Sequence, residues 1–382
     1  MYPSLSYWER ETFFRGIDVA VIGSGIVGLT AAIHLREQAP DLRVVVIERG
    51  VFPLGASTRN AGFACFGSIS ELLDDMEHRS EAEVWALVAR RWQGLKRLRE
   101  RLGDAAIGYE ENGGYELFRA DEQTALERCA DHIKTFNSEL SHLIGRKDVY
   151  QEASDRIRVN GFQGVTGLLL NSAEGQIHTG RMMHALWALA RSLGVEMYNG
   201  TEIVQMETHS DEVLLHTKQG WTFHCAQVLV ATNGFAANLL PELDVQPARN
   251  QVLITQPISG LKIKGCFHYD RGYYYFRDVD GNRILFGGGR NLAPQEEATD
   301  QFGTTPLIRE ALLKLLQEVI LPGQSVAVDT WWSGILGIGP EKAPIIRRLN
   351  PRLSVSVRMG GMGVAIGSLV GEEGAMEVLS GF

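Results

Sequence analysis

The sequence has little cysteine: its 382 residues include only Cys65, Cys129, Cys225 and Cys266. These form no C-x-x-C pair, so their spacing predicts neither a disulfide framework nor a metal site. No apolar run approaches the roughly 20 residues that a membrane span needs. The first residues also lack the charged and then apolar pattern of a signal peptide. We therefore expect a cytoplasmic protein without membrane contact.

Positive charge is also scarce, because 37 lysines and arginines face 46 acidic residues, for a net charge of -9. A nucleic-acid-binding protein needs a basic face to displace counterions from phosphates, so we expect no nucleic-acid partner. The apolar share of 45% and the charged share of 22% are ordinary for a globular chain. The length predicts two or three domains. Glycine is abundant, with 42 residues, which indicates tight turns and close backbone contacts.

The first motif is a glycine-rich turn between a strand and a helix. Residues 17–22 (IDVAVI) read as a buried parallel strand, which leads into Gly23-Ser24-Gly25-Ile26-Val27-Gly28 and a helix over 29–38. A second buried strand over 42–47 ends at Glu48 and Arg49, and Glu48 follows Gly28 by 20 residues. This spacing predicts a dinucleotide site, with the pyrophosphate at the helix N-terminus and Glu48 on a ribose hydroxyl. An acid at this position disfavours NADP and leaves FAD and NAD open.

Three later segments are candidates for the rest of such a site. The loop 55–63 contains Ser57, Thr58, Arg59, Asn60, Ala61 and Gly62, and Arg59 suits a phosphate or flavin contact. A strand over 227–231 leads into Thr232-Asn233-Gly234. A strand over 353–359 leads into Gly360-Gly361-Met362-Gly363 and a helix that starts at Val364. A surface loop and plain strand ends are the alternative interpretations.

Together these motifs resemble the FAD-dependent D-amino-acid oxidase superfamily, of the glycine oxidase and sarcosine oxidase type. The matching pieces are GSGIVG with Glu48, GASTRNAGF, VLVATNG, YYYFRDVDGNRILFGGGRN at 273–291, WWSGILGIGPEKAPII at 331–346, and GGMGVAIG at 360–367. GASTRNAG, the stretch from Trp332 to Pro344 and the FGGGR turn are most similar to gamma-glutamylputrescine oxidase-like proteins. The resemblance covers nearly the whole chain in order. It implies an FAD cofactor, and it adds Gly334 to the expected cofactor contacts.

The resemblance also implies the fold. We expect an α/β protein with a Rossmann-like FAD-binding domain and an α+β substrate domain built on a large antiparallel sheet. The dinucleotide motifs are far apart in the chain, so the FAD-binding domain is expected to be discontinuous, over 1–75, 151–235 and 331–382. Residues 76–150 and 236–330 are expected to form the substrate-binding domain. Residues 177–193 are expected to form a helix of the FAD-binding domain.

A basic amphipathic helix is expected over 84–102, where an apolar stripe alternates with several arginines. Such a helix can lie on an anionic membrane or dock an electron acceptor. More often it packs its stripe on a sheet and leaves its charges in solvent, and we favour this second interpretation.

Candidate substrate residues follow from strand alternation near residue 275. Period 2 places Tyr273, Tyr275 and Arg277 on one face, where aromatic rings could hold an amine and an arginine a carboxylate. A strand that packs aromatics into a core is the alternative interpretation. His268 and Arg290 are weaker candidates. No residue is assigned as the catalytic acid or base.

The sequence also departs from what the resemblance implies. Amino-acid oxidases of this superfamily hold the substrate carboxylate with an arginine in the segment that matches 334–344, where this chain has none. That departure favours an amine over an α-amino acid. The cysteine that binds flavin covalently and the lysine that aids the oxygen reaction in sarcosine oxidases are also unmatched, with Leu285 at the lysine position. We therefore expect noncovalent FAD, with oxygen or another electron acceptor.

The expected reaction is the oxidation of a C–N bond in a small amine or amino acid by hydride transfer to flavin N5, which gives an imine that hydrolyses. Two other classes stay open. The chain could be an FAD-dependent 2-hydroxy acid dehydrogenase, which needs a base, with His178 and His268 as candidates. It could also be a non-catalytic flavin-binding subunit.

Overall fold

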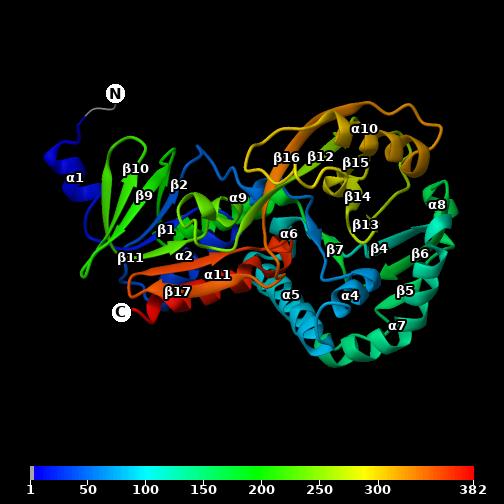
Figure 1. Cartoon of the computed structure of the whole chain (residues 1–382), viewed down its shortest axis with the longest axis horizontal. Helices are drawn as coiled ribbons and strands as arrows, with labels where there is room; N and C mark the ends of the chain where they lie inside the picture. The colour runs from blue at the N-terminus through cyan, green and yellow to red at the C-terminus, as the bar shows by residue number, and fades with distance from the viewer. Residues whose placement is uncertain (1–3) are drawn as a thin grey trace.

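The computed structural model describes residues 4–382, and two eight-stranded sheets organise them (Figure 1). The first sheet has the strand order β17 (Ile345–Asn350), β18 (Leu353–Val357), β11 (Thr222–Val230), β1 (Ile17–Ile22), β2 (Val44–Glu48) and β8 (Glu196–Asn199). The five strands from β18 to β8 are parallel to one another, whereas β17 is antiparallel to β18. β9 (Ile203–Thr208) and β10 (Val213–Thr217) form a hairpin, and β10 pairs antiparallel with the first half of β11.

Both faces of the parallel strands are apolar, as expected for a sheet that is covered on both sides. Val19, Val21, Val44 and Val46 face the helices α2 (Ile26–Gln38), α9 (Thr179–Ser192) and α11 (Gly363–Leu379). The alternate residues of the same strands pack against the β9–β10 hairpin and Phe223. The predicted strand–turn–helix–strand unit is thus present. The apolar cluster between these strands and the helices α2, α9 and α11 is called the first core.

The second sheet is antiparallel except where β13 pairs with β4. Its strand order is β16 (Val328–Ile338), β12 (Gln246–Thr255), β15 (Arg283–Gly288), β14 (Tyr274–Val279), β13 (Cys266–Tyr269), β4 (Gly114–Arg119), β6 (Val165–Asn171) and β5 (Tyr150–Glu152). Its outer face carries α10 (Pro306–Leu315) on an aromatic core that includes Phe267, Tyr274 and Phe276. Tyr275 lies on the opposite face from Tyr274 and Phe276, as the period-2 alternation of the sequence predicts.

The remaining elements are short or connect the two sheets. A two-stranded ribbon pairs β3 (Phe63–Ala64) with β7 (Gly175–Gln176). The other helices are α1 (Tyr7–Phe13), α3 (Ala56–Arg59), α4 (Ile69–Met76), α5 (Glu81–Leu102), α6 (Asp104–Ile107), α7 (Gln123–Ile144) and α8 (Arg156–Asn160). Figure 1 shows α11 running beneath the first sheet, from the middle of the molecule to the C-terminus, with α5 near its start. Within residues 4–382, no helix is both long and apolar enough to cross a bilayer.

The sheets divide the chain at other residues than the predicted domain boundaries. β6 lies in the predicted FAD-binding segment 151–235, but it pairs with β4 in the second sheet. β16 extends into the segment 331–382, but it pairs with β12 along its length. Conversely, α5 lies in the predicted substrate segment 76–150 and packs closely on α11, where a Cβ at Gly94 would overlap the Ala365 carbonyl. Strand pairing over long sequence distances is not visible in local periodicity, so the sequence does not locate these boundaries.

The basic helix α5 packs its apolar stripe as the favoured interpretation expects, but its charges are not all left in solvent. Its apolar stripe, with Val84, Val88 and Leu98, is buried in the first core. Its arginines pair with acidic residues of the same chain: Arg90 with Glu373 at 2.7 Å, and Arg101 with Glu37 and Glu372 at 3.0 Å. These charges are therefore largely neutralised within the fold.

Candidate active site

A cavity opens at the carboxyl ends of the parallel strands β1, β2 and β11. Ligands of open α/β sheets bind at this edge, because the strand ends and helix N-termini meet there. The cavity is lined by fourteen of the predicted cofactor-binding residues: Gly23, Gly25, Ile26, Val27, Glu48, Arg49, Ser57, Asn60, Thr232, Asn233, Gly234, Gly361, Gly363 and Val364. Five separate segments of the sequence thus meet around one space.

The glycine turn has the geometry that makes glycine necessary. Gly23 has a φ of +104°, and a Cβ there would lie 2.9 Å from the Ala231 carbonyl oxygen. Gly28 lies against the same turn, where a Cβ would overlap the Gly23 carbonyl oxygen. Gly28 therefore permits close helix–strand packing and does not line the cavity. Gly25 has no side chain that could cap α2, and Ser57 takes only the Ile26 amide, so the rest of this helix N-terminus is open to an anion.

Glu48 ends β2 with its carboxylate held in place. One oxygen accepts hydrogen bonds from the Ser24 amide at 3.1 Å and the Ser24 hydroxyl at 2.7 Å. The other oxygen accepts from the Gly50 amide at 2.9 Å. A carboxylate has about four acceptor positions, so capacity remains for a ligand hydroxyl. Arg49 next to it lies over the Phe235 ring at 3.7 Å.

The loop 55–63 joins the turn to the second sheet. The Ser57 hydroxyl accepts from the Ile26 amide at 3.0 Å, at the start of α2. The Arg59 guanidinium donates to the Ser333 carbonyl at 3.0 Å and lies over the Phe302 ring. Thr58 donates to the Pro53 carbonyl, and Gly62 lies against Ile177 and Arg277. Thr58 and Gly62 therefore shape the loop without lining either cavity.

The first turn of α11 lies where the first cavity meets a second one. Gly360 and Gly361 have φ values of +56° and +86°, and α11 begins at Gly363 without a side-chain cap. Asn233, itself at a φ of +47°, accepts from the Met359 amide at 3.0 Å and fixes this turn. Both cavities are lined by Ala56, Asn60, Leu336, Gly361 and Val364. The helix N-terminus is thus common to both.

The second cavity separates the inner face of the second sheet from the loop 55–68 and the helices α4, α5 and α11. Its lining includes five of the remaining eight predicted cofactor-binding residues: Arg59, Ala61, Gly334, Gly360 and Met362. It also includes three predicted substrate residues, His268, Tyr273 and Tyr275. Phe63 and His268 meet edge to face, as do Phe63 and Tyr275, so the cavity wall is aromatic.

Arg277, predicted as a carboxylate ligand, is placed elsewhere. Its side chain is buried and donates to the carbonyl oxygens of Ala61, Asp278 and Ile177. It does not line the cavity, because it is used to fasten the loop 55–63 and the start of α9 to the second sheet. Strand alternation predicted the correct face for Arg277, but position along the strand decided its contacts.

Arg290 does line the cavity, as do Arg59, Arg91 and Arg271. It lies beside Tyr273, with its guanidinium carbon 5.7 Å from the ring centre. Among residues 4–382, no acidic side chain forms an ion pair with it. Asn250 also lines the cavity, and its buried side-chain oxygen has no hydrogen-bond partner in the described part of the chain. A cation and an amide acceptor are therefore available to a ligand.

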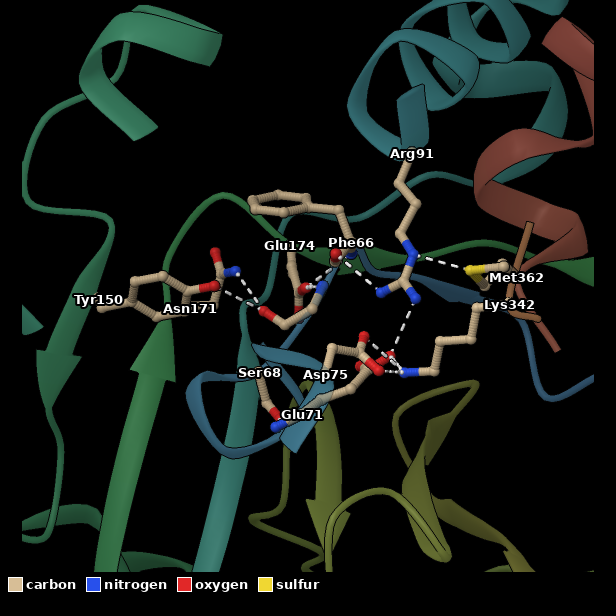
Figure 2. A network of polar contacts seen from close by, with 11 residues as sticks. Phe66, Ser68, Glu71, Asp75, Arg91, Tyr150, Asn171, Glu174, Lys342 and Met362 are labelled. Carbon is tan, nitrogen blue, oxygen red and sulfur yellow. Dashed lines mark hydrogen bonds and ion pairs between the residues drawn. The ribbon is translucent and has the colours of Figure 1, made fainter. Parts of the chain in front are cut away.

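A charged network closes the side of the cavity opposite the sheet (Figure 2). Arg91 donates to Glu71 at 2.9 Å, to the Phe66 carbonyl at 3.0 Å and to the Met362 sulfur at 2.9 Å. Lys342 contacts Glu71 at 3.2 Å and Asp75 at 2.6 Å. Burial opposes ionisation of Glu71, but the charges of Arg91 and Lys342 outweigh it and hold the Glu71 pKa well below its ordinary value. The network ties α4, α5 and the first turn of α11 together.

Burial shifts the other titratable groups beside the cavity toward their neutral forms. It lowers the pKa of His268 to about 4 and raises that of Tyr275. It also raises the pKa of Glu116 and of Glu174 to about 7, although both accept hydrogen bonds. At pH 7, His268 is therefore neutral.

Comparison with known proteins places the chain in a family. Residues 18–376 match the family model described as FAD dependent oxidoreductase. The gamma-glutamylputrescine oxidoreductase of Escherichia coli strain K12 is 27% identical over 368 residues, which is 93% of this chain and 82% of that protein. Glycine oxidase from Geobacillus kaustophilus superimposes with a TM-score of 0.75 at 23% identity, over 95% of this chain and 94% of that one. Iminodiacetate oxidase from Chelativorans sp. BNC1 superimposes with a TM-score of 0.77 at 18% identity, over 95% of each.

The chain belongs to the FAD-dependent oxidoreductase family. The predicted resemblance, fold class and FAD cofactor are thereby confirmed. The first cavity fits the cofactor on its own evidence, since a largely open helix N-terminus and an acidic strand end face the same space. The buried Thr232 hydroxyl also lines it without a hydrogen-bond partner in the described chain, as expected where a ligand supplies one.

Some lining residues of this oxidoreductase were missed from sequence. The first cavity is also lined by Thr201, Glu202, Ile203, Phe235 and Asn238. The first three follow β8, which pairs with β2, so they lie at the same edge of the sheet as Glu48. The charged residues Glu71, Arg91 and Lys342 of the second cavity were missed as well. Local sequence patterns do not indicate that β8 lies beside β2, because strand order is a tertiary feature.

Proposed function

We propose that this flavoprotein oxidises the C–N bond of a small amine or amino acid. FAD, when bound, supplies at N5 the acceptor for the hydride that leaves the carbon next to nitrogen. The substrate loses that hydride and a nitrogen-bound proton and becomes an imine, which water hydrolyses to a carbonyl product and a free amine or ammonia. The first sheet with its helices would hold the cofactor, and the second sheet would form the wall on the substrate side.

One observation carries this proposal: the two cavities meet at the uncapped first turn of α11. A cofactor that fills the first cavity would present its far end there, in contact with the second cavity. The backbone N–H groups and helix dipole at this turn favour negative charge, which a reduced cofactor carries. The second cavity brings a substrate to the same turn, so proximity and orientation would supply much of the rate.

The lining of the second cavity supports a nitrogen-containing substrate. Phe63, Tyr273 and Tyr275 offer aromatic faces to a cationic or neutral amine. Arg290 would bind a substrate carboxylate, and the Asn250 side-chain oxygen would accept a hydrogen bond from a substrate N–H group. This pair favours an amino acid within this class. Three relatives are named for gamma-glutamylputrescine, glycine and iminodiacetate, and each of these compounds contains C–N bonds.

The hydroxy acid alternative is less well supported by the residues. It requires a base, for which His178 and His268 are the candidates. His178 is exposed, caps α9 by accepting from the Arg181 amide at 3.2 Å, and lies outside the lining of both cavities. Only His268 lies in the cavity, and burial lowers its pKa to about 4, which makes it a weak base.

Anaerobic reduction of the flavin absorption band tests the proposal. Matched pairs that differ only in nitrogen or oxygen, such as glycine and glycolate, are added with amines, N-methyl amino acids and D-amino acids. We expect bleaching by nitrogen compounds only. Bleaching by 2-hydroxy acids alone would move the function to C–OH oxidation, and a flavin that no compound reduces would indicate a binding subunit.

The same preparation tests two further parts of the proposal. Readmission of air to the reduced protein shows whether oxygen or another molecule is the electron acceptor, because oxygen would reoxidise the flavin and form peroxide. Release of the flavin by acid would show noncovalent binding. The proposal also retains a cytoplasmic location, which cell fractionation tests.

A further inference from the structure

Three metal-ligating side chains meet beside the second cavity. The Cys65 sulfur, a Glu174 carboxylate oxygen and a His268 ring nitrogen all lie within 4.8 Å of one another. They come from the segment after β3, the turn before β7 and the strand β13. Figure 2 shows Glu174 beside the Phe66 backbone, at the end of the charged network. Because the three residues are far apart in the sequence, their spacing gives no metal motif.

A second set of contacts converges on the same point. The Cys65 thiol donates to the Gly175 carbonyl at 3.8 Å, and the Cys266 thiol donates to that oxygen at 3.3 Å. Glu174 is itself held, since one oxygen accepts from the amides of Phe66 at 2.7 Å and Gly67 at 2.9 Å. Hydrogen bonds of this kind orient the carboxylate at a metal site.

The donor set and its spacing suit a borderline-soft divalent ion. Thiolate, imidazole and carboxylate bind Zn²⁺ at about 2.0–2.3 Å, so tetrahedral ligand atoms lie about 3.3–3.7 Å apart. In the structure these ligand atoms are at most 4.8 Å apart, so side-chain movements of about 1 Å would bring them to the separations of a tetrahedral site. The nearby Arg91 charge is neutralised by Glu71 and does not exclude a cation.

We propose that Cys65, Glu174 and His268 bind one Zn²⁺-class ion. Cys65 and His268 both line the second cavity, so the remaining coordination position faces it. The ion would fasten the loop after β3 to the second sheet, at the wall where substrate is proposed to bind. This site goes beyond the proposed oxidation and does not depend on it.

Equilibrium dialysis tests the site directly. FAD-loaded, reduced-thiol protein is stripped with a chelator, dialysed against Zn²⁺ at pH 7.5, and its zinc content is measured. We expect one bound equivalent, with affinity lowered at least about tenfold in Cys65→Ser and in His268→Gln. Cys129→Ser is the matched control, because this thiol is buried in α7 and is not a member of the cluster, so its loss should leave binding unchanged. Equal affinity in all variants, or no bound equivalent in the unaltered protein, would overturn the site.

A spectroscopic readout does not depend on whether the variants fold well. Cd²⁺ is softer than Zn²⁺ and gives an ultraviolet thiolate-to-cadmium absorption when a cysteine binds it. We expect this band in the unaltered protein and in Cys129→Ser. Its absence from the unaltered protein refutes thiolate coordination even if Cys65→Ser loses its flavin. Neither result involves substrate turnover, so the site and the proposed oxidation fail separately.

Discussion

Replacing Arg91 with methionine tests the charged network most directly. The Arg91 side chain is 4% exposed and the Glu71 side chain 29% exposed. Breaking a buried pair costs about 3–5 kcal/mol, because it leaves a charge without its partner. Glu71 keeps Lys342 and partial solvent contact, so the lower end, about 3 kcal/mol, applies. At about 2.1 cal/mol/K per residue, a chain of 382 residues unfolds with an entropy of about 0.8 kcal/mol/K, and the expected loss in Tm is about 4 °C.

The assay is thermal release of flavin fluorescence, with Arg97→Met as the control. Arg97 lies on the same helix, but its side chain is 59% exposed and its contact with Glu372 is 3.7 Å. Such pairs contribute little, so its loss should shift Tm by less than about 1 °C. Arg91 helps hold the Glu71 pKa below its ordinary value, so the stability it contributes is present above pH 4.5 and is lost on acidification. The reasoning is refuted if the two variants lose equal stability at pH 7.

Three further predictions concern the two cavities. Thr232→Val should raise the Kd for FAD about fivefold, because it removes a hydroxyl that lines the first cavity. The control Thr30→Val removes an equally unpartnered hydroxyl outside the cavity and should leave this Kd unchanged. Flavin titration of the apoprotein measures both, and equal effects would contradict a contact between Thr232 and FAD. Arg290→Met should weaken binding of benzoate, a carboxylate without an oxidisable C–N bond, about tenfold or more, as followed by the flavin spectrum. The control Arg271→Met also removes a cation that lines the cavity, but Asp74 and Asp270 already pair with it, so this Kd should change little. Burial raises the pKa of Glu116 to about 7 from 4.5, so the folded protein binds an extra proton between these values and loses stability as pH rises through them. Glu116→Gln should therefore reduce the fall in Tm between pH 5 and pH 8, and an unchanged fall would show that Glu116 ionises normally.

The local motifs of the first sheet could be predicted because their causes are local. A buried parallel strand needs a continuous apolar run, as in β1 and β2. The turn after β1 needs Gly23 for its positive φ and Gly28 for contact with the turn. The same reasoning located the loop 55–63 and the first turn of α11. For these segments, the chain's own backbone sterics dictate the residue types.

The substrate side could be predicted only in part, because alternation defines a face but not a neighbour. It placed Tyr275 on the inner face and Tyr274 and Phe276 in the outer core. It could not distinguish Arg277, which is buried against backbone carbonyls, from Arg290, which lines the cavity. Which arginine meets a ligand depends on the loop that packs against each, and that loop comes from the other end of the chain.

The sequence by itself determined the dinucleotide-binding unit, the alternating strands and the family of this oxidoreductase, since each follows from residue order. Tertiary structure alone decided where the sheets divide the chain, and it assembled the network of Arg91, Glu71 and Lys342. It also assembled the cluster of Cys65, Glu174 and His268. These arrangements join side chains from distant segments, and no periodicity within one segment specifies which distant segment will pack against it.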